Sequence, residues 1–202
     1  MVEIIYIIIF PIILFLFFNN KYVFNYKIIK NNQKTYNFDI YILNFFIILN
    51  FILILSLIDL KVSNILFLIL IYYFFTNIFL LKKIEILKNI KKLSKYLIFL
   101  SIFYLLSFYI ISNPDLGWDA KFHWYKKALS FYQNMGFENL TTLPKYEYPH
   151  FGTFLWSMFW TMSPLKYEYF GRLFYLFLYL LSIYSITDLI KNNKIKHLLF
   201  VL

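Results

Sequence analysis

Long, unbroken runs of apolar residues dominate the chain, and these residues do not alternate with polar ones. Four runs precede residue 113 and two follow residue 150; they cover residues 2–18, 39–58, 62–81, 96–112, 151–163 and 169–190. A helix needs about 20 mainly apolar residues to cross a hydrocarbon core of about 30 Å, and several runs reach that length. The pattern therefore predicts an all-α fold, a polytopic transmembrane helical bundle.

Polar connectors divide the chain into three regions. Residues 1–112 form an N-terminal transmembrane region of four spans, residues 113–150 form an external loop, and residues 151–202 hold further spans. The last apolar run, after Lys196, has only six residues, too few to cross a bilayer as helix. We therefore expect the chain to be the front part of a longer protein, and the number of spans after residue 150 stays open.

Composition agrees with a membrane protein. The 202 residues are 61% apolar and only 15% charged, whereas a soluble domain has about 45–50% apolar and about 25% charged residues. The absence of Cys excludes disulfides, thiolate metal sites and cysteine nucleophiles. The net charge of +10 comes from basic residues between apolar runs, where they set topology and contact anionic headgroups. We therefore expect membrane lipids as partners and no nucleic acid.

The lysines also predict an orientation. If the N-terminus is outside, 12 of the 20 basic residues fall in inner connectors, chiefly at 19–38 and 82–95. Cytoplasmic loops retain positive charge, so this count places the loop 113–150 on the outer face. That face is periplasmic in a bacterium or lumenal in an endoplasmic reticulum. We expect a multi-pass integral protein of the bacterial inner membrane.

The loop 113–150 concentrates the polar chemistry of the chain. It holds four of the ten acids, two of the three His and two of the four Trp. Apolar residues at 118, 122, 125, 129 and 132 have the spacing of one helix face, and Gly136 is placed to end that helix. The opposite face carries Asp119, His123, Lys126, Lys127 and Ser130. This pattern predicts an amphipathic helix that lies flat in the membrane interface.

The two ends of this loop supply a candidate proton acceptor and a stiff segment that leads back to the membrane. Asp119 lies in the first turn, where the helix dipole keeps a carboxylate ionised and able to accept a proton. Pro144 and Pro149 stiffen the chain, so that Tyr148 and His150 re-enter the membrane at a fixed place. Plain interfacial anchoring by Trp, Tyr and Lys accounts for the same residues and stays an alternative.

Several short motifs follow one another in a distinctive order. They are Trp118-Asp119-Ala120, Trp124, Lys127-Ala128, Tyr132 and Tyr148-Pro149, with Gly171 and Arg172 ahead of a long apolar run. Over residues 112–190 this order resembles the first external loop of GT-C membrane glycosyltransferases. These polyprenyl-phosphate-sugar enzymes include protein O-mannosyltransferases and the lipid A aminoarabinose transferase. In that family an Asp of this loop, near the start of an interfacial helix, is catalytic.

The resemblance implies transfer of a sugar from a polyprenyl-phosphate donor to a hydroxyl of a lipid, glycan or protein acceptor at the outer face. Asp119 would be the general base, and Lys126 or Lys127, of which we prefer Lys127, would stabilise the departing phosphate. His123 would orient Asp119 or bind substrate. We expect no cofactor and no obligatory metal, because Asp119 and His123 alone supply half a metal site.

Tyr148 and His150 would line the entrance to this site from the membrane. A different class of protein also explains the composition: a non-catalytic multi-span membrane component, such as a transporter subunit or an envelope scaffold. That alternative needs no special role for Asp119.

Overall fold

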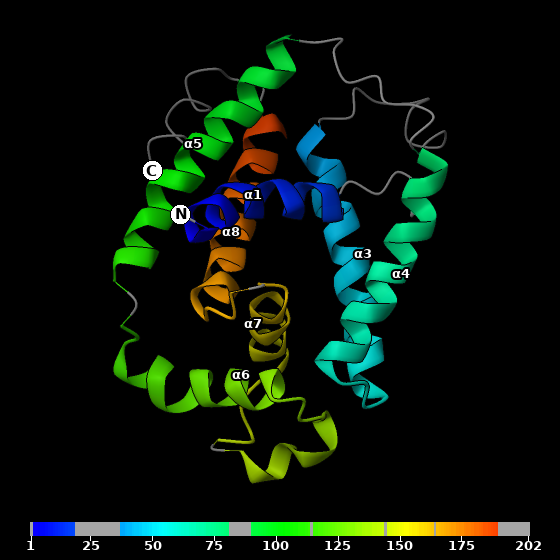
Figure 1. Ribbon diagram of the computed structural model, residues 1–202, viewed down its shortest axis with the longest axis vertical. Coiled ribbons are helices and arrows are strands. Elements are labelled where there is room, and N and C mark those ends of the chain that lie inside the picture. The colour runs from blue at the N-terminus through cyan, green and yellow to red at the C-terminus, as the bar shows by residue number, and fades with distance from the viewer. Residues whose placement is uncertain are drawn as a thin grey trace. The chain divides into compact units, whose positions relative to one another are not determined.

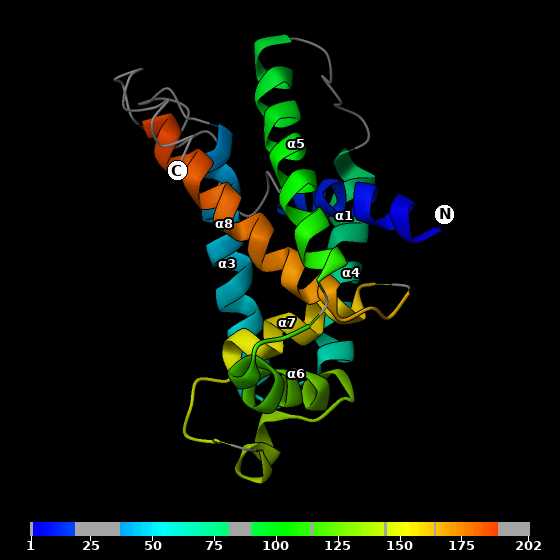
Figure 2. The same ribbon diagram turned by 90° about the vertical axis from the view of Figure 1, so that its left-hand side faces the viewer.

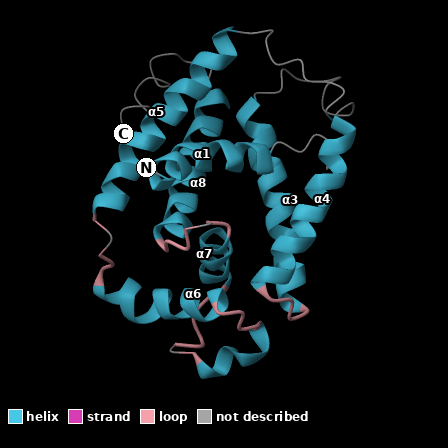
Figure 3. Ribbon diagram, in the orientation of Figure 1, coloured by secondary structure: helices cyan, strands magenta, loops and turns pink. Residues whose placement is uncertain are grey.

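The protein is helical throughout the part of the chain that its structure describes (Figures 1 and 3). The computed structural model describes residues 2–18, 37–80, 90–113, 115–143, 145–163 and 165–189. Within these ranges every regular element is a helix, which confirms an all-α fold. The elements are α1 (Val2–Phe18), α3 (Asn37–Leu57), α4 (Val62–Leu80), α5 (Ile90–Ser112), the π-helix η1 (Ala120–Trp124), α6 (Tyr125–Tyr132), the 3₁₀-helix η2 (Phe137–Thr142), α7 (Phe151–Thr161) and α8 (Tyr169–Leu189).

Two of the described helices are long and apolar enough to cross a membrane. They contain the segments Lys95–Ser112 in α5 and Tyr169–Thr187 in α8. The eleven residues of α7 extend only about 16 Å at 1.5 Å per residue, so α7 does not cross a hydrocarbon core of about 30 Å by itself. The lysine-rich connector segments 19–36 and 81–89 and the terminal segment 190–202, which entered the predicted topology, lie outside the described residues.

The chain forms two compact units, each assembled from segments distant in sequence. Unit 1 comprises Met1–Leu49, Glu85–Leu105 and Leu176–Leu202, and unit 2 comprises Asn50–Ile84 and Leu106–Tyr175. Unit 2 contains the whole loop 113–150 and therefore every candidate site residue.

Aromatic rings fill the centre of unit 1. The Phe15 ring of α1 meets four other rings edge to face, at centroid separations of 4.9 to 5.5 Å. These rings belong to Tyr41, Tyr96, Phe99 and Phe177. Edge-to-face contact brings the positive edge of one ring against the negative face of another, which stabilises the pair beyond simple burial. One aromatic cluster thereby joins α1, α3, α5 and α8.

Helix α7 is the centre of unit 2. All eight residues at 153–160 are buried, because α6, α4 and the start of α8 pack around this short helix. Phe154 contacts Phe131 of α6, and the Phe159 ring stacks on Phe174 of α8 at 3.6 Å. A helix that is apolar on all sides is expected to be enclosed, and α7 is enclosed by protein.

A close approach of α7 and α8 requires a glycine. A Cβ atom at Gly171 would lie 2.1 Å from Cδ1 of Trp156 and 2.5 Å from its carbonyl oxygen, so no side chain fits there. At the beginning of α8, Arg172 forms a 3.0 Å ion pair with Glu168, and both side chains are largely buried. Burial raises the pKa of Glu168, and Arg172 opposes that rise.

The turn between α3 and α4 is fixed to the loop 113–150. Asp59 adopts the left-handed conformation in this turn, with φ of 62°, and its Oδ1 accepts a 3.1 Å hydrogen bond from the backbone N–H of Glu138. Asp59 therefore caps the N-terminus of η2 from a distant part of the chain. Gly136 makes room for it, because a Cβ there would lie 2.2 Å from Asp59 Oδ1. Backbone hydrogen bonds at residues 58–60 form the tight turn that joins α3 to α4.

Candidate functional site

The predicted helix from Trp118 is present, but a π-turn interrupts it. Residues Ala120–Trp124 form η1, and the backbone N–H of Tyr125 donates to the carbonyl of Ala120, five residues earlier. One extra residue in a turn rotates everything that follows by about 100°. Residues 118 and 122, before the turn, therefore no longer share one face with residues 125, 129 and 132 of α6, and the predicted apolar face is not continuous.

The π-turn changes which side chains are buried. In α6 the buried residues are Lys127, Ala128 and Phe131, whereas the expected apolar residues Trp118 and Phe122 are 71% and 42% exposed. The prediction of one water-facing side carrying both Asp119 and Lys127 is therefore wrong.

Part of the predicted apolar face does contact protein. The rings of Tyr125 and Tyr132 stack on Trp160 of α7, at 5.9 and 4.1 Å. Helix α6 also runs crosswise to α4 in both Figure 1 and Figure 2. Tyr125 and Tyr132 therefore attach α6 to the enclosed helix α7.

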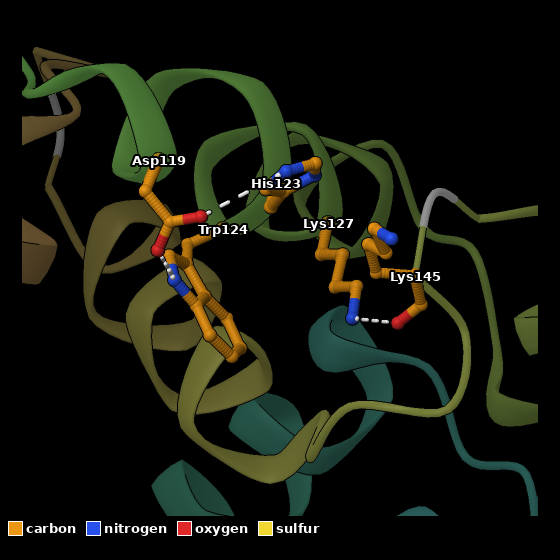
Figure 4. A network of polar contacts seen from close by, with 5 residues as sticks. All are labelled: Asp119, His123, Trp124, Lys127 and Lys145. Carbon is orange, nitrogen blue, oxygen red and sulfur yellow. Dashed lines mark hydrogen bonds and ion pairs between the residues drawn. The ribbon is translucent and has the colours of Figure 1, made fainter.

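Asp119 presents an exposed carboxylate that is held by one side-chain donor. Its side chain is 64% exposed, and Oδ2 accepts a 3.0 Å hydrogen bond from Nε1 of Trp124 (Figure 4). The second oxygen, Oδ1, lies 3.8 Å from Nε2 of His123. Asp119 and Trp124 are five residues apart, the spacing that a π-turn brings onto one side of a helix. The π-turn therefore creates the Asp119–Trp124 contact.

His123 lies under the carboxylate and is mostly buried. Its side chain is 18% exposed, and its ring meets Trp118 edge-on at 5.7 Å. Its Nδ1 is buried and makes no hydrogen bond within the described part of the chain. His123 therefore lies one helical turn from Asp119 and beside its Oδ1, while its role as an orienting residue stays a prediction.

Lys127 is fully buried beneath the return path of the loop. Its Nζ donates a 2.6 Å hydrogen bond to the carbonyl oxygen of Lys145, the contact drawn in Figure 4. Burial lowers the pKa of Lys127, and the carboxylate of Glu147 opposes that fall. The ammonium of Lys127 is enclosed by protein groups, so it does not face a site where a lipid phosphate would arrive.

Two aromatic rings complete the enclosure of Lys127. Its Nζ lies 5.3 Å from the centroid of Trp124 and 5.6 Å from that of Tyr148, both within cation–π range. The two rings stack on each other, with centroids 6.0 Å apart and an interplanar angle of 27°. The structure thereby brings Tyr148 beside Asp119's hydrogen-bond donor.

His150 lies next to this cluster, just before α7. Its Nε2 donates to the carbonyl of Tyr146, and its own carbonyl accepts a 2.7 Å hydrogen bond from the Thr153 hydroxyl in the first turn of α7. Burial lowers the pKa of His150, the Tyr146 carbonyl opposes this, and the positive charge of Lys127 lowers it further.

Lys126 is the exposed lysine of the predicted pair. Its Nζ lies 5.4 Å from the centroid of the exposed Phe122 ring, so both side chains lie on the outer side of the helix. Among the residues described, no three His, Cys, Asp or Glu side chains gather in a geometry that would hold a metal ion.

Reasoning from the sequence missed two participants of the cluster. Trp124 has no side-chain hydrogen-bond acceptor three or four residues away, so its bond to Asp119 depends on the π-turn. The Lys145 contact uses a backbone carbonyl, which every residue possesses. The only sequence signal for the Asp119–Trp124 contact is a Trp five residues after an Asp.

Comparison of this chain with known protein families, characterised proteins and solved structures finds no match.

Proposed function

We propose that this protein is a multi-pass membrane glycosyltransferase, with the loop 113–150 on the outer face of a bacterial inner membrane. It moves a sugar from a polyprenyl-phosphate donor to a hydroxyl acceptor on a lipid, glycan or protein. The observation that carries the proposal is the exposed carboxylate of Asp119, held by the Trp124 indole at the start of a short helix.

The place of Asp119 in the chain suits a lipid-linked substrate. Only six residues separate it from Ser112, the end of the apolar helix α5. The seven Cα–Cα steps from Ser112 to Asp119 span at most about 25 Å when fully extended. If α5 crosses the membrane, Asp119 therefore stays near the membrane surface, where the sugar of a polyprenyl phosphate is presented.

The chemistry follows from the charges at this helix. The Asp119 carboxylate takes the proton of the acceptor hydroxyl while that oxygen attacks the anomeric carbon in line. The bond from this carbon to the phosphate oxygen breaks, and the polyprenyl phosphate leaves with both electrons. The product has the inverted configuration.

Two further residues take supporting roles. Lys126 is exposed on the same helix, so it replaces the enclosed Lys127 as the residue that stabilises the departing phosphate. His123 places its Nε2 3.8 Å from Asp119 Oδ1, and the electrostatic contact between an N–H on that nitrogen and the carboxylate orients Asp119.

The proposal is tested by an Asp119→Asn change in the full-length protein. The Asn side-chain oxygen still accepts the Trp124 bond, but the proton acceptor is gone, and losing a general base lowers the rate by about 10²- to 10⁴-fold. The assay follows labelled sugar from polyprenyl phosphate in membranes with equal protein abundance. Asp115→Asn, the same change at an exposed carboxylate four residues earlier, is the matched control.

The result also separates the enzyme from a membrane scaffold. Full transfer by Asp119→Asn shows that Asp119 is not the base. Absence of transfer even by the unmutated full-length protein, with several donor sugars, supports the non-catalytic membrane component instead.

A further inference from the structure

An exposed aspartate on a helix ordinarily moves between rotamers in water. Asp119 is different because one carboxylate oxygen is bound by an indole N–H that belongs to a fixed ring. An indole has a single donor whose direction is set by the plane of the ring. The direction of the carboxylate therefore depends on whatever holds the Trp124 ring.

The Trp124 ring is held from two sides. The Tyr148 ring stacks on it at 6.0 Å, and the Lys127 ammonium lies 5.3 Å from its centroid. Lys127 is itself fixed, because it is fully buried and bonded to the Lys145 carbonyl. That carbonyl also accepts the backbone N–H of Tyr148 at 3.0 Å.

A buried lysine is a costly way to fill space. Taking an ammonium out of water costs free energy that an apolar side chain of similar size avoids. The cost is offset here by one carbonyl and two ring faces, and these groups define a direction that an apolar contact lacks. The contacts thus form a continuous path from a buried cation to an exposed carboxylate.

We propose that Trp124 is the positioning residue of the Asp119 carboxylate, and that Lys127 and Tyr148 clamp the Trp124 ring. Trp124 acts through Asp119 and does not itself touch the reacting atoms. The inference rests on the proposed function, in which Asp119 is the base. It assigns Lys127 to the clamp and not to the binding of phosphate.

A Trp124→Phe change tests the donor alone. Phe keeps the stack on Tyr148 and the face toward Lys127 but removes the N–H. We expect kcat to fall by about 10²-fold with KM nearly unchanged, because a small misplacement of a reacting group has an effect of that size. Tyr146→Phe, which alters an exposed ring of the same loop, should leave kcat unchanged.

A double-mutant cycle separates positioning from general folding. Once Asp119 is Asn, the base is absent, so adding Trp124→Phe should lower the residual rate no further. An additional fall of the same size as in the unmutated background would show that Trp124 acts on the structure as a whole, and it would overturn the inference.

A measurement without catalysis separates this inference from the proposed function. The 202 residues hold four Trp, so ¹⁵N-Trp labelling of the full protein in lipid nanodiscs gives an indole N–H resonance for each of them, which single Trp→Phe variants assign. Asp119→Ala should shift the Trp124 resonance, and Lys127→Met should shift or broaden the same one. A Trp124 resonance unmoved by Asp119→Ala overturns the inference even if sugar transfer is found. A shifted resonance in a protein that transfers no sugar supports the positioning contact and removes the proposed function.

Discussion

The two units of this protein hold their helices together by different means. In unit 1 the contacts between helices are ring against ring, as at Phe15, Phe99 and Phe177, together with hydrogen bonds donated by the hydroxyls of Tyr96 and Tyr104. In unit 2 ring stacking on α7 is combined with polar contacts that fix the connecting segments: the Asp59 cap on η2 and the Lys127 bond to the Lys145 carbonyl.

The two kinds of contact differ in how strictly they fix the arrangement of the helices. Apolar rings pack well in several arrangements, so helices that are apolar on most sides tolerate small rotations and slips. A hydrogen bond weakens steeply when its angle changes, so it fixes one arrangement. Polar contacts that fix connecting segments lie around the exposed carboxylate of Asp119, which suits the role proposed for it, because a reactive group must keep its direction.

The largest expected effect is at Gly171, where unit 2 tolerates no side chain. In Gly171→Ala the new Cβ meets Trp156, including its backbone oxygen, which cannot move without α7. We expect a loss at or above the upper end of about 1–3 kcal/mol, the usual cost of overpacking. Thermal unfolding of the purified protein in detergent measures it.

Two comparisons sharpen this result. Gly117→Ala adds the same methyl group where nothing lies within 4 Å, so it should change stability by less than about 0.5 kcal/mol. Phe99→Leu in the aromatic cluster of unit 1 should cost only about 1 kcal/mol, because apolar neighbours repack. If Gly171→Ala is no more harmful than these two, the close contact of α7 and α8 is not as tight as described.

The second effect distinguishes two adjacent lysines. Lys127→Met keeps the volume of the buried side chain but removes the bond to the Lys145 carbonyl, whereas Lys126→Met changes an exposed residue. We expect the loop 145–150 to open more easily by about 1–2 kcal/mol in the first variant, a factor of about 5–30 in protease cleavage there. Lys126→Met should cleave like the unmutated protein; equal cleavage of the two variants would contradict the clamp.

The helices show how much of the fold the sequence predicts. The apolar runs predicted the helices α1, α3, α4, α5 and α8 because runs of that length have no other stable form in an apolar environment. The periodicity of residues 118–132 predicted a helix there. It failed to identify the buried side, because a π-turn without a sequence signature separates residues 118 and 122 from residues 125–132, and in the helix after the turn Lys127 is buried.

Contacts between distant segments were beyond prediction for a different reason. The Asp59 cap on η2 joins residues 79 positions apart, and no local pattern in either segment refers to the other. The run 151–163 has the composition of a short membrane span, whereas α7 is an eleven-residue helix enclosed by protein. Composition alone does not distinguish burial in lipid from burial in protein.

The third effect concerns the cap on η2. A Cβ in Gly136→Ala would displace the Asp59 carboxylate, and loss of an N-cap costs about 1 kcal/mol. Asp59→Ala should cost a similar amount, whereas Asp59→Asn keeps the oxygen that accepts the Glu138 N–H and should cost less. Hydrogen exchange of the Glu138 amide measures the cap directly. Slow exchange in all three variants would show that η2 does not depend on Asp59.

The smallest effect is a pH dependence at His150. Its pKa in the folded protein lies below the ordinary 6.5, because burial and the nearby Lys127 charge disfavour the imidazolium. Above pH 6.5 the ring is neutral in both folded and unfolded protein, so its contribution to stability is fully present. As the pH falls from 6.5 toward the lower folded pKa, the unfolded protein binds a proton that the folded protein does not, and stability is lost.

The lowered pKa of His150 also predicts which variant removes the pH dependence. His150→Gln retains a side-chain N–H for the Tyr146 carbonyl but cannot titrate. When the pH is lowered from 7.5 to 5.5, protease cleavage of the loop 145–150 should therefore increase in the unmutated protein and stay constant in the variant. Lys127→Met removes the positive charge that lowers the His150 pKa, and it should therefore weaken the pH dependence without abolishing it. Equal protease resistance of the loop 145–150 at both pH values would contradict this prediction, because it would show that the surroundings of His150 do not hold its ring neutral. The start of α7 would then be held by the hydrogen bond of Thr153 and by the helix itself.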